Sequence, residues 1–320
     1  MNDRGRRASN GVPLVGKHLL IVAGKGGVGR STVAAAIGAA AARSGLRALV
    51  VETAGRADVP SLLGRPAGDP LNEVELLRGL HHVTIDRRGA LEEYLRQEVP
   101  GPFPAGVLAR NRAFQLFVEA APGMSDLLTI GKVWELFGRT RHKPRAHPYD
   151  LVVLDAPASG QLLGLLAAPR TFREIARIGP VAGQATRIER AIANPADVAA
   201  IVVATPEQMA VTEALWLQAA LSERFKVQIE AVVVNRLLPA WFSAEEGLAL
   251  AAAPDDPAIR SARWFHTRAQ VQRAELERLE DQLQTIPWLT LPFLFDAELG
   301  QAHVEQFGDL LAGRSHERVG

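Results

Sequence analysis

The sequence predicts an α/β fold, in which a doubly wound and mostly parallel sheet carries helices on both faces. Short apolar runs alternate along the 320 residues with longer helical patterns, and this alternation is typical of parallel sheets. The first apolar run ends in the glycine-rich turn AGKGGVGRST at residues 23–32, and an alanine-rich helical stretch follows. A strand, a glycine-rich turn and a helix in this order are the context in which phosphate-binding loops occur.

The strands and helices are predicted from the period of the apolar residues. Buried strands are expected at residues 17–24, 46–53, 81–86, 149–157, 198–205, 229–236 and 288–294. Helices are expected at residues 31–44, 89–99, 206–225 and 261–283. The helix at 261–283 is highly charged and its apolar face is narrow, so we expect a surface helix rather than a membrane anchor.

Residues 16–320 are expected to form one domain. Within it, residues 101–143 and 162–194 carry helical patterns without clear strands. We expect these two segments to form a helical layer over the carboxyl ends of the strands, where ligands of open α/β sheets bind. Residues 1–15 are polar and basic, without the apolar core of a secretion signal. They are expected to be a disordered tail.

The composition narrows the classes of function. The formal net charge is +1 and 22% of the residues are charged, which favours neither a polyanion-binding protein nor an acidic one. The chain has no cysteine, so disulfides and cysteine-based zinc sites are excluded and a reducing compartment is favoured. No apolar run reaches the roughly 18–20 residues of a membrane span. We therefore expect a cytoplasmic protein with at most peripheral membrane association and no sequence-specific nucleic acid partner.

The glycine-rich turn predicts a nucleotide site. Gly24, Gly29 and Ser31 match the pattern Gly, four residues, Gly, Lys, Ser or Thr. Backbone N–H groups of such a turn point at phosphate oxygens, the following helix adds its positive end, and the Ser31 hydroxyl would bind Mg²⁺. The alternative is a glycine-rich turn without a ligand. The residues expected to bind the phosphates are Gly24, Lys25, Gly26, Gly27, Val28, Gly29, Arg30, Ser31 and Thr32.

Arg30 departs from this pattern, because a lysine normally stands at its position. Arginine keeps the positive charge and can bind two phosphate oxygens at once. Its guanidinium is larger than an ammonium and its geometry is fixed, so it does not fill the same cavity without moving the phosphates. We expect nucleotide binding to survive this replacement better than turnover.

Asp155 is the second metal candidate. It ends the apolar run YDLVVLD and is followed by APASG, a loop of small residues suited to sensing a γ-phosphate. A carboxylate at this place can bind Mg²⁺ through a water molecule or orient such a water. An aspartate that ends a strand can also be only a turn former or a helix cap. We favour the metal role because the strand and the upstream loop agree.

Taken in order, these motifs resemble those of the arsenite-transport and tail-anchored-protein-targeting ATPases, which are P-loop NTPases with a deviant Walker A loop. The phosphate loop GKGGVGRST, with its early lysine, is moderately specific by itself, whereas the ordered set of segments, which includes DAPASGQLLGLLAAP, is a strong match. The resemblance runs from about residue 17 to residue 313 and identifies a member with a single ATPase half. The matching segments are residues 24–32, 81–95, 121–136, 155–169, 232–239 and 291–300.

The resemblance implies several roles. In this family two halves face each other, and each early lysine reaches the phosphates that the opposite half holds. Lys25 would be that lysine, although it can also be an ordinary surface lysine. Residues 26–32 would hold the phosphates, and Ser31 would bind Mg²⁺. Asn235, Pro292 and Phe293 would border the adenine.

Three replacements weaken the expected chemistry. Ala54 stands where the family has an aspartate that positions the attacking water, and Gln161 replaces a histidine. Glu52 or Asp58 can substitute for that aspartate only if the loop rearranges. Together with Arg30, these replacements predict slow or partner-dependent hydrolysis. The residues expected to take part in catalysis are Lys25, Arg30, Asp155 and Gln161.

Three hypotheses of function follow. The first is a Mg²⁺- and ATP-dependent dimeric switch, formed with a second copy or with a paralogous ATPase, that moves an unknown protein or small-molecule client through its helical layer. The second is a non-catalytic nucleotide-binding scaffold or a regulatory subunit of a heterodimer. The third, a partitioning ATPase on DNA or membranes, is disfavoured by the near-neutral charge.

Overall fold

Eight strands form one sheet in the order β3-β4-β2-β5-β1-β6-β7-β8. Every pairing in it is parallel except that of β3 with β4. The computed structural model describes residues 11–12, 16–53, 57–86, 89–91, 93, 123–138, 148–176, 180–283 and 285–314. The strands are β1 (Leu19–Gly24), β2 (Ala48–Glu52), β3 (Val74–Leu77), β4 (Leu80–Thr84), β5 (Leu151–Asp155), β6 (Val198–Ala204), β7 (Gln228–Leu237) and β8 (Trp288–Pro292).

The predicted fold class is confirmed, and all seven predicted strands are present with slightly different ends. The apolar pattern of the sequence did not predict β3. Its four residues VELL lie at the edge of the sheet and only one of them is buried. Such a short, half-exposed segment lacks the continuous apolar run that marks a buried strand.

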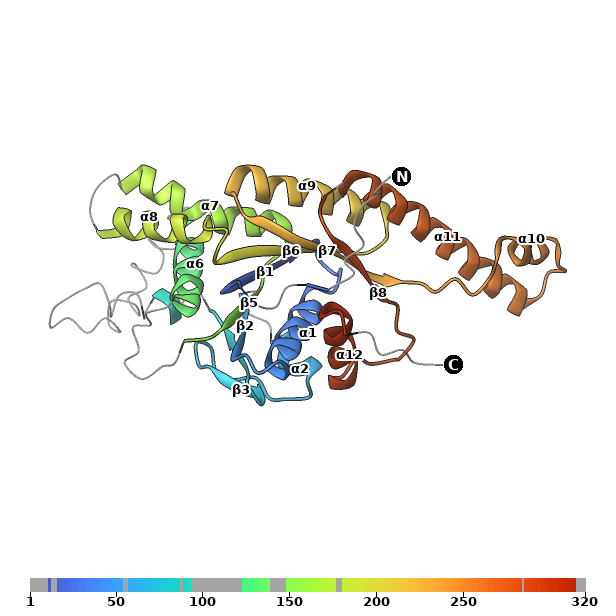
Figure 1. Cartoon of the computed structure of the whole chain (residues 1–320), viewed down its shortest axis with the longest axis horizontal. Helices are drawn as coiled ribbons and strands as arrows, with labels where there is room; N and C mark the ends of the chain where they lie inside the picture. Colours follow the sequence, from blue (N-terminus) through green and yellow to red (C-terminus); the bar gives the residue numbers. More distant parts are fainter. Residues whose placement is uncertain are drawn as a thin grey trace, which may run out of the picture.

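Helices cover both faces of the sheet (Figure 1). On one face α1, α2 and α12 pack over one buried cluster, and α6, α7, α8 and α9 share a second cluster on the other face. The segment 162–194 is covered by α7 and α8, and α6 is the described part of 101–143. The helices are α1 (Arg30–Arg43), α2 (Asp58–Leu62), α6 (Met124–Phe137), α7 (Ser159–Ala176), α8 (Pro180–Ile192), α9 (Gln208–Phe225), α10 (Ala244–Ala252), α11 (Pro257–Leu283) and α12 (Gln301–Leu311).

The predicted helices at 31–44, 206–225 and 261–283 correspond to α1, α9 and α11. The predicted helix at 89–99 and residues 101–122 and 139–143 of the helical region lie wholly or largely outside the described residues. The same holds for the expected tail at 1–15, apart from residues 11 and 12.

Helix α1 lies in the narrow space between the sheet and α12. Its alanines are almost completely buried, and small side chains are needed because backbone approaches backbone there. Gly308 of α12 is a point of close approach, since a Cβ at this position would lie 2.8 Å from the backbone oxygen of Ala36. The alanine-rich pattern of the sequence is therefore a packing requirement.

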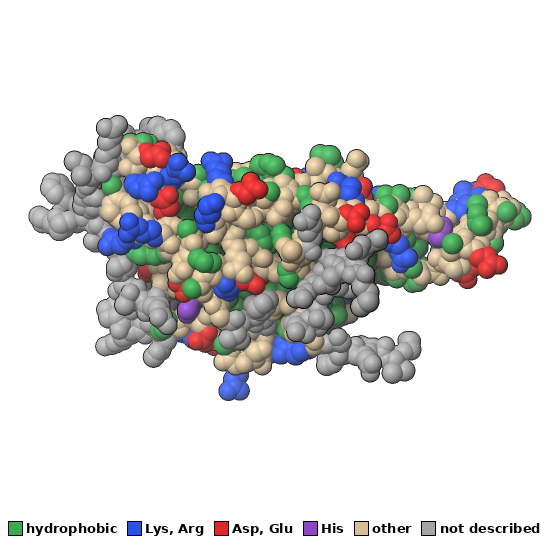
Figure 2. Space-filling view, turned by 45° about the horizontal axis from the view of Figure 1, so that its top comes forward, with side chains coloured by type: hydrophobic (Ala, Val, Ile, Leu, Met, Phe, Trp, Pro, Cys, Tyr) green, Lys and Arg blue, Asp and Glu red, His purple; other side chains and the backbone are tan. Residues whose placement is uncertain are grey.

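Helices α10 and α11 project from the sheet as an arm (Figure 1). None of the nine residues of α10 is buried, and a capping box between Ser243 and Glu246 closes its first turn. Hydrophobic side chains appear at the tip of the arm among charged ones (Figure 2), and Leu248 of α10 is 74% exposed. Within the described part of the chain, every helix is too short or too polar to cross a membrane.

The Gly308→Val substitution should lower the free energy of unfolding by about 1–3 kcal/mol, because the added atoms collide with the backbone of α1. Gly183→Val in α8 is the matched control, since a Cβ there meets no atom within 4 Å. That control should change stability by less than about 0.5 kcal/mol. Urea unfolding of both variants measures the difference, and equal losses would contradict the tight packing of α12 on α1.

Candidate functional site

The carboxyl ends of three neighbouring strands meet at one edge of the sheet. β5 lies between β1 and β2, and Asp155 is level with Val22 on one side and Glu52 on the other. The loop after β1 leads through Gly24 to Gly29 and into α1. The parallel register therefore gathers the two carboxylates and the glycine-rich loop in one place.

The glycine-rich loop has the conformation that its glycines permit. Gly29 is the N-cap of α1 with φ of 94°, in the left-handed region that favours glycine. A Cβ on Gly29 would lie 2.3 Å from Nδ2 of Asn235, and one on Gly24 would lie 2.3 Å from the Val203 carbonyl oxygen. No acidic residue stands in the first turn of α1. The first turn of α1 thus contributes no carboxylate of its own to the positive end of the helix, which favours an anion there.

Ser31 and Asp155 are directly linked. The Ser31 hydroxyl donates a hydrogen bond of 2.6 Å to Oδ2 of Asp155. The other oxygen, Oδ1, is buried and has no hydrogen-bond partner within the described residues. Burial raises the pKa of Asp155 from 3.8 to about 6, and the nearby Glu52 and Asp58 carboxylates add to this rise. The hydrogen bond from Ser31 and the charge of Arg30 oppose it.

The side chain of Arg30 is bonded within the chain. Its guanidinium donates a hydrogen bond through Nη1 to the backbone oxygen of Ala156, just behind Asp155. Burial lowers the pKa of Arg30, while the carboxylates of Asp155 and Glu213 raise it. The arginine that replaces the usual lysine therefore braces the loop against the end of β5.

Asn235 holds the loop from the other side. It is buried near the end of β7, and its Nδ2 donates a hydrogen bond of 2.9 Å to the backbone oxygen of Val28. Its Oδ1 accepts a hydrogen bond of 2.9 Å from the backbone N–H of Arg236, whose φ is 62°. The family resemblance implies that Asn235 borders the adenine, and this role stays a prediction. In the structure Asn235 clamps the phosphate loop to the sheet.

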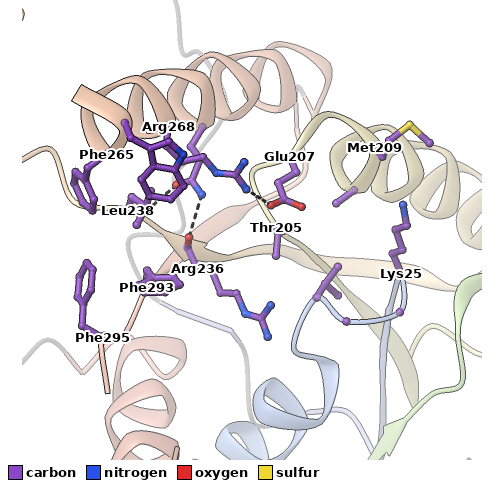
Figure 3. Close-up of a pocket in the computed structure, with 16 residues that line it drawn as sticks. Lys25, Thr205, Glu207, Met209, Arg236, Leu238, Phe265, Arg268, Phe293 and Phe295 are labelled. Carbon is purple, nitrogen blue, oxygen red and sulfur yellow. Dashed lines mark hydrogen bonds and ion pairs between the residues drawn. The ribbon is translucent and has the colours of Figure 1, made fainter. Parts of the chain in front are cut away.

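A cavity of about 640 Å³ opens beside the loop (Figure 3). The loop contributes its residues 25–28, and aromatic side chains of the α11 and β8 region contribute much of the opposite side. Flat apolar faces next to a phosphate loop suit a nucleotide base. Of the three residues predicted to border the base, Phe293 lines the cavity, whereas Asn235 and Pro292 do not. The aromatic lining residues are Trp264, Phe265, Phe293 and Phe295.

Gln272 joins α11 to the end of β7 on the floor of this cavity. Its buried side chain accepts a hydrogen bond of 2.8 Å from the N–H of Leu238 and donates one of 3.4 Å to the Arg236 carbonyl. Arg268 of α11 pairs with Glu207 at 2.6 Å (Figure 3). Sequence reasoning missed these residues because helical periodicity marks only the apolar face of α11, and Gln272 and Arg268 are polar.

The region that would position an attacking water contains Ala54, which lies outside the described residues. Both carboxylate oxygens of Glu52 are occupied by contacts within the chain. Its Oε1 accepts from the N–H of Asp58 at 2.9 Å, and its Oε2 accepts from Val59 at 3.2 Å and lies 2.6 Å from Nε2 of His82. This carboxylate is buried and caps the start of α2, so the expectation that it cannot replace the missing aspartate without rearrangement agrees with its contacts.

The two remaining predicted catalytic residues are more exposed. Gln161 lies exposed in the first turn of α7, where its N–H donates to the Ala158 carbonyl at 2.8 Å. Nζ of Lys25 lies 3.9 Å from Oε2 of Glu213 in α9. The structure thus brings Arg30 and Asp155 together with Ser31 and leaves Lys25 at the rim of the cavity.

Comparisons with known proteins identify the family and several relatives of this chain. A family model described as Anion-transporting ATPase matches residues 17–179 and 175–313. The chain is 28% identical over 316 residues to the ATPase BagA of Mycobacterium tuberculosis, a match that covers 91% of this chain and 92% of that protein. It is 24% identical over 320 residues to a Halobacterium salinarum protein named as an arsenical pump-driving ATPase, covering 94% of this chain and 45% of that protein.

Asn235→Ala should lower the free energy of unfolding by about 1–3 kcal/mol, because the buried Val28 carbonyl and the Arg236 N–H both lose their partner. Asn72→Ala, at an exposed position, is the control and should change stability by less than about 0.5 kcal/mol. Urea unfolding of the nucleotide-free protein measures both. A loss no larger than that of the control would contradict the clamp.

Asp155 should make the nucleotide-free and metal-free protein less stable as the pH rises from about 4 to 6. The native state keeps the Asp155 proton up to about pH 6, whereas the unfolded state releases it near pH 4, so the stability present below pH 4 is lost across this interval. The loss should reach about 3 kcal/mol. Asp155→Asn removes it, and the exposed Asp281→Asn is the control. A pH-independent difference between Asp155→Asn and wild type would contradict the assignment.

Proposed function

The chain belongs to the anion-transporting ATPase family, and on that premise we propose that it binds Mg²⁺ and ATP at residues 24–32 and works as a nucleotide switch. The contact between Ser31 and Asp155 carries this proposal. A hydroxyl from the first turn of α1 meets a carboxylate at the end of β5, and Oδ1 of Asp155 is buried without a partner within the described residues. Oxygen ligands of this kind suit Mg²⁺.

Each part of the nucleotide has a matching part of the chain. Backbone N–H groups of residues 26–32 and the start of α1 would hold the phosphates, and Ser31 and Asp155 would hold Mg²⁺. The metal, when bound, neutralises charge on the phosphates. The cavity beside the loop, with Phe293 in its lining, would take the adenine. Asn235 keeps the loop in place from behind.

We propose that hydrolysis is slow or depends on a partner. The guanidinium of Arg30 is already bonded to Ala156, so it must leave that contact to reach phosphate oxygens. The carboxylate of Glu52 is fully used in capping α2. Gln161 is exposed and retains the ability to orient a water molecule, as a glutamine does in some GTPases.

The switch is proposed to act in the cytoplasm as a dimer, either with a second copy or with a paralogous ATPase subunit. Lys25 is half-exposed at the loop, where it would reach phosphates across an interface. The client would be an unidentified protein or small molecule bound by the helical layer. Because the chain has no cysteine, a metalloid held by thiolates is not part of the proposal.

The second candidate is a scaffold that binds nucleotide without turning it over. The Arg30–Ala156 contact favours it, because an arginine retained by the protein is not free to stabilise the charge of phosphoryl transfer. In that case the chain would be the regulatory subunit of a heterodimer.

Calorimetric titration with Mg²⁺·ATP tests the binding site. Wild type should bind, and Asp155→Asn should weaken binding about tenfold or more because it removes the negative charge that would help to hold Mg²⁺. Asp281→Asn, exposed on α11, is the matched control and should bind like wild type. A wild-type chain that binds no nucleotide would refute the proposal.

Phosphate release by the same proteins separates the two candidates. Arg30→Lys should raise turnover by about tenfold or more, because lysine reaches the phosphates without the Ala156 contact. If wild type releases phosphate and Lys25→Ala abolishes it, the chain is a self-sufficient ATPase. If both wild type and Arg30→Lys bind ATP without turnover, the scaffold candidate is favoured.

A further inference from the structure

Glu213 contacts two segments of the nucleotide site at once. It lies on α9, and its Oε2 is 3.9 Å from Nζ of Lys25 in the phosphate loop. Its Oε1 accepts a hydrogen bond from the hydroxyl of Ser159, which follows Asp155 at the start of α7. Figure 3 shows Lys25 rising from the loop towards α9, on the side of Met209. One carboxylate therefore joins α9 to the loop and to the segment behind β5.

The two contacts differ in strength. Ser159 is buried, so its hydrogen bond to Glu213 is shielded from water and fixes the carboxylate in place. The pair with Lys25 is long and its side chains are 38% and 27% exposed. An exposed ion pair at such a distance contributes little and breaks easily. Glu213 is thus a fixed acceptor to which Lys25 is only loosely attached.

The Glu213 carboxylate also interacts electrostatically with the basic side chains of the site. Burial lowers the pKa of Arg30, and Glu213 is one of the two carboxylates that oppose this effect by their charge. Its negative charge therefore lies within electrostatic reach of both basic side chains of the loop. Phosphate oxygens that enter the site compete with Glu213 for Lys25.

We infer that Glu213 is a positioning residue that holds Lys25 against α9 in the nucleotide-free chain and releases it when phosphates arrive. This inference rests on the proposed function, because it needs a nucleotide at the phosphate loop. Its consequence is that the chain keeps its own lysine in place until the site is filled. Since the carboxylate remains bonded to Ser159, release of Lys25 does not require α7 to move.

The test is a double-mutant cycle on the apparent Kd for Mg²⁺·ATP at one protein concentration. The four proteins are wild type, Glu213→Gln, Lys25→Ala and the double variant. Glutamine keeps an oxygen that accepts from Ser159 and removes the charge. Glu213→Gln should lower the apparent Kd about threefold or more, and in the Lys25→Ala background the change should shrink to below about 1.5-fold. Glu223→Gln, an exposed position on α9, is the matched control.

A second experiment measures the reactivity of the Lys25 amine in the absence of nucleotide. The rate of acylation of its amine, followed by peptide mass spectrometry, should rise at least about twofold in Glu213→Gln and stay unchanged in Glu223→Gln. Adding Mg²⁺·ATP to wild type should change the rate at Lys25 because the lysine changes partner.

The outcomes of these measurements distinguish the inference about Glu213 from the proposed nucleotide site. An equal gain in affinity with and without Lys25 would show that Glu213 acts only by repelling phosphates, and it would overturn the inference while leaving the nucleotide site intact. No gain in either background, or an unchanged acylation rate, would also overturn it. A wild-type chain that binds no Mg²⁺·ATP would refute the proposed function and the inference with it.

Discussion

The parallel register of β2, β5 and β1 is the constraint on which the site depends. It fixes Glu52 level with Asp155 and delivers the chain from β1 into the glycine-rich loop at the same edge. The aspartate is buried there, and a second carboxylate lies on the next strand, so its proton is held more tightly than usual. The hydroxyl of Ser31 reaches it only because α1 starts directly above this edge. A shift of any of these strands by one residue would separate the groups.

The end of β7 adds a second constraint by joining the loop to the projecting arm. Asn235 bonds the Val28 carbonyl on one side and the Arg236 N–H on the other. Gln272 then bonds Leu238 and Arg236 from α11. The base of the arm also supplies aromatic lining to the cavity. A chain of direct contacts therefore runs from the glycine-rich loop to α11.

Two charged side chains of the site, those of Arg30 and Glu52, have bonding partners within the chain. Arg30 bonds the Ala156 carbonyl, and Glu52 caps α2 and pairs with His82. A charged side chain in a buried place needs such partners, since leaving it unpaired is costly. Arg30, one of the departures from the family pattern, is thus built into the surrounding packing, so restoring a lysine there also removes the contact with Ala156.

The sequence by itself determined the fold class, seven of the eight strands, and the loop with Ser31 and Asp155, because apolar period and glycine spacing are local signals. The resemblance to arsenite-transport ATPases, read from ordered motifs, is confirmed by the family match over most of the chain. Tertiary structure alone decided the edge strand β3, the clamp made by Asn235, and the partners of Arg30 and Lys25. Those features depend on contacts between residues far apart in the chain, and a polar side chain carries no sign in the sequence of which distant group it will bond.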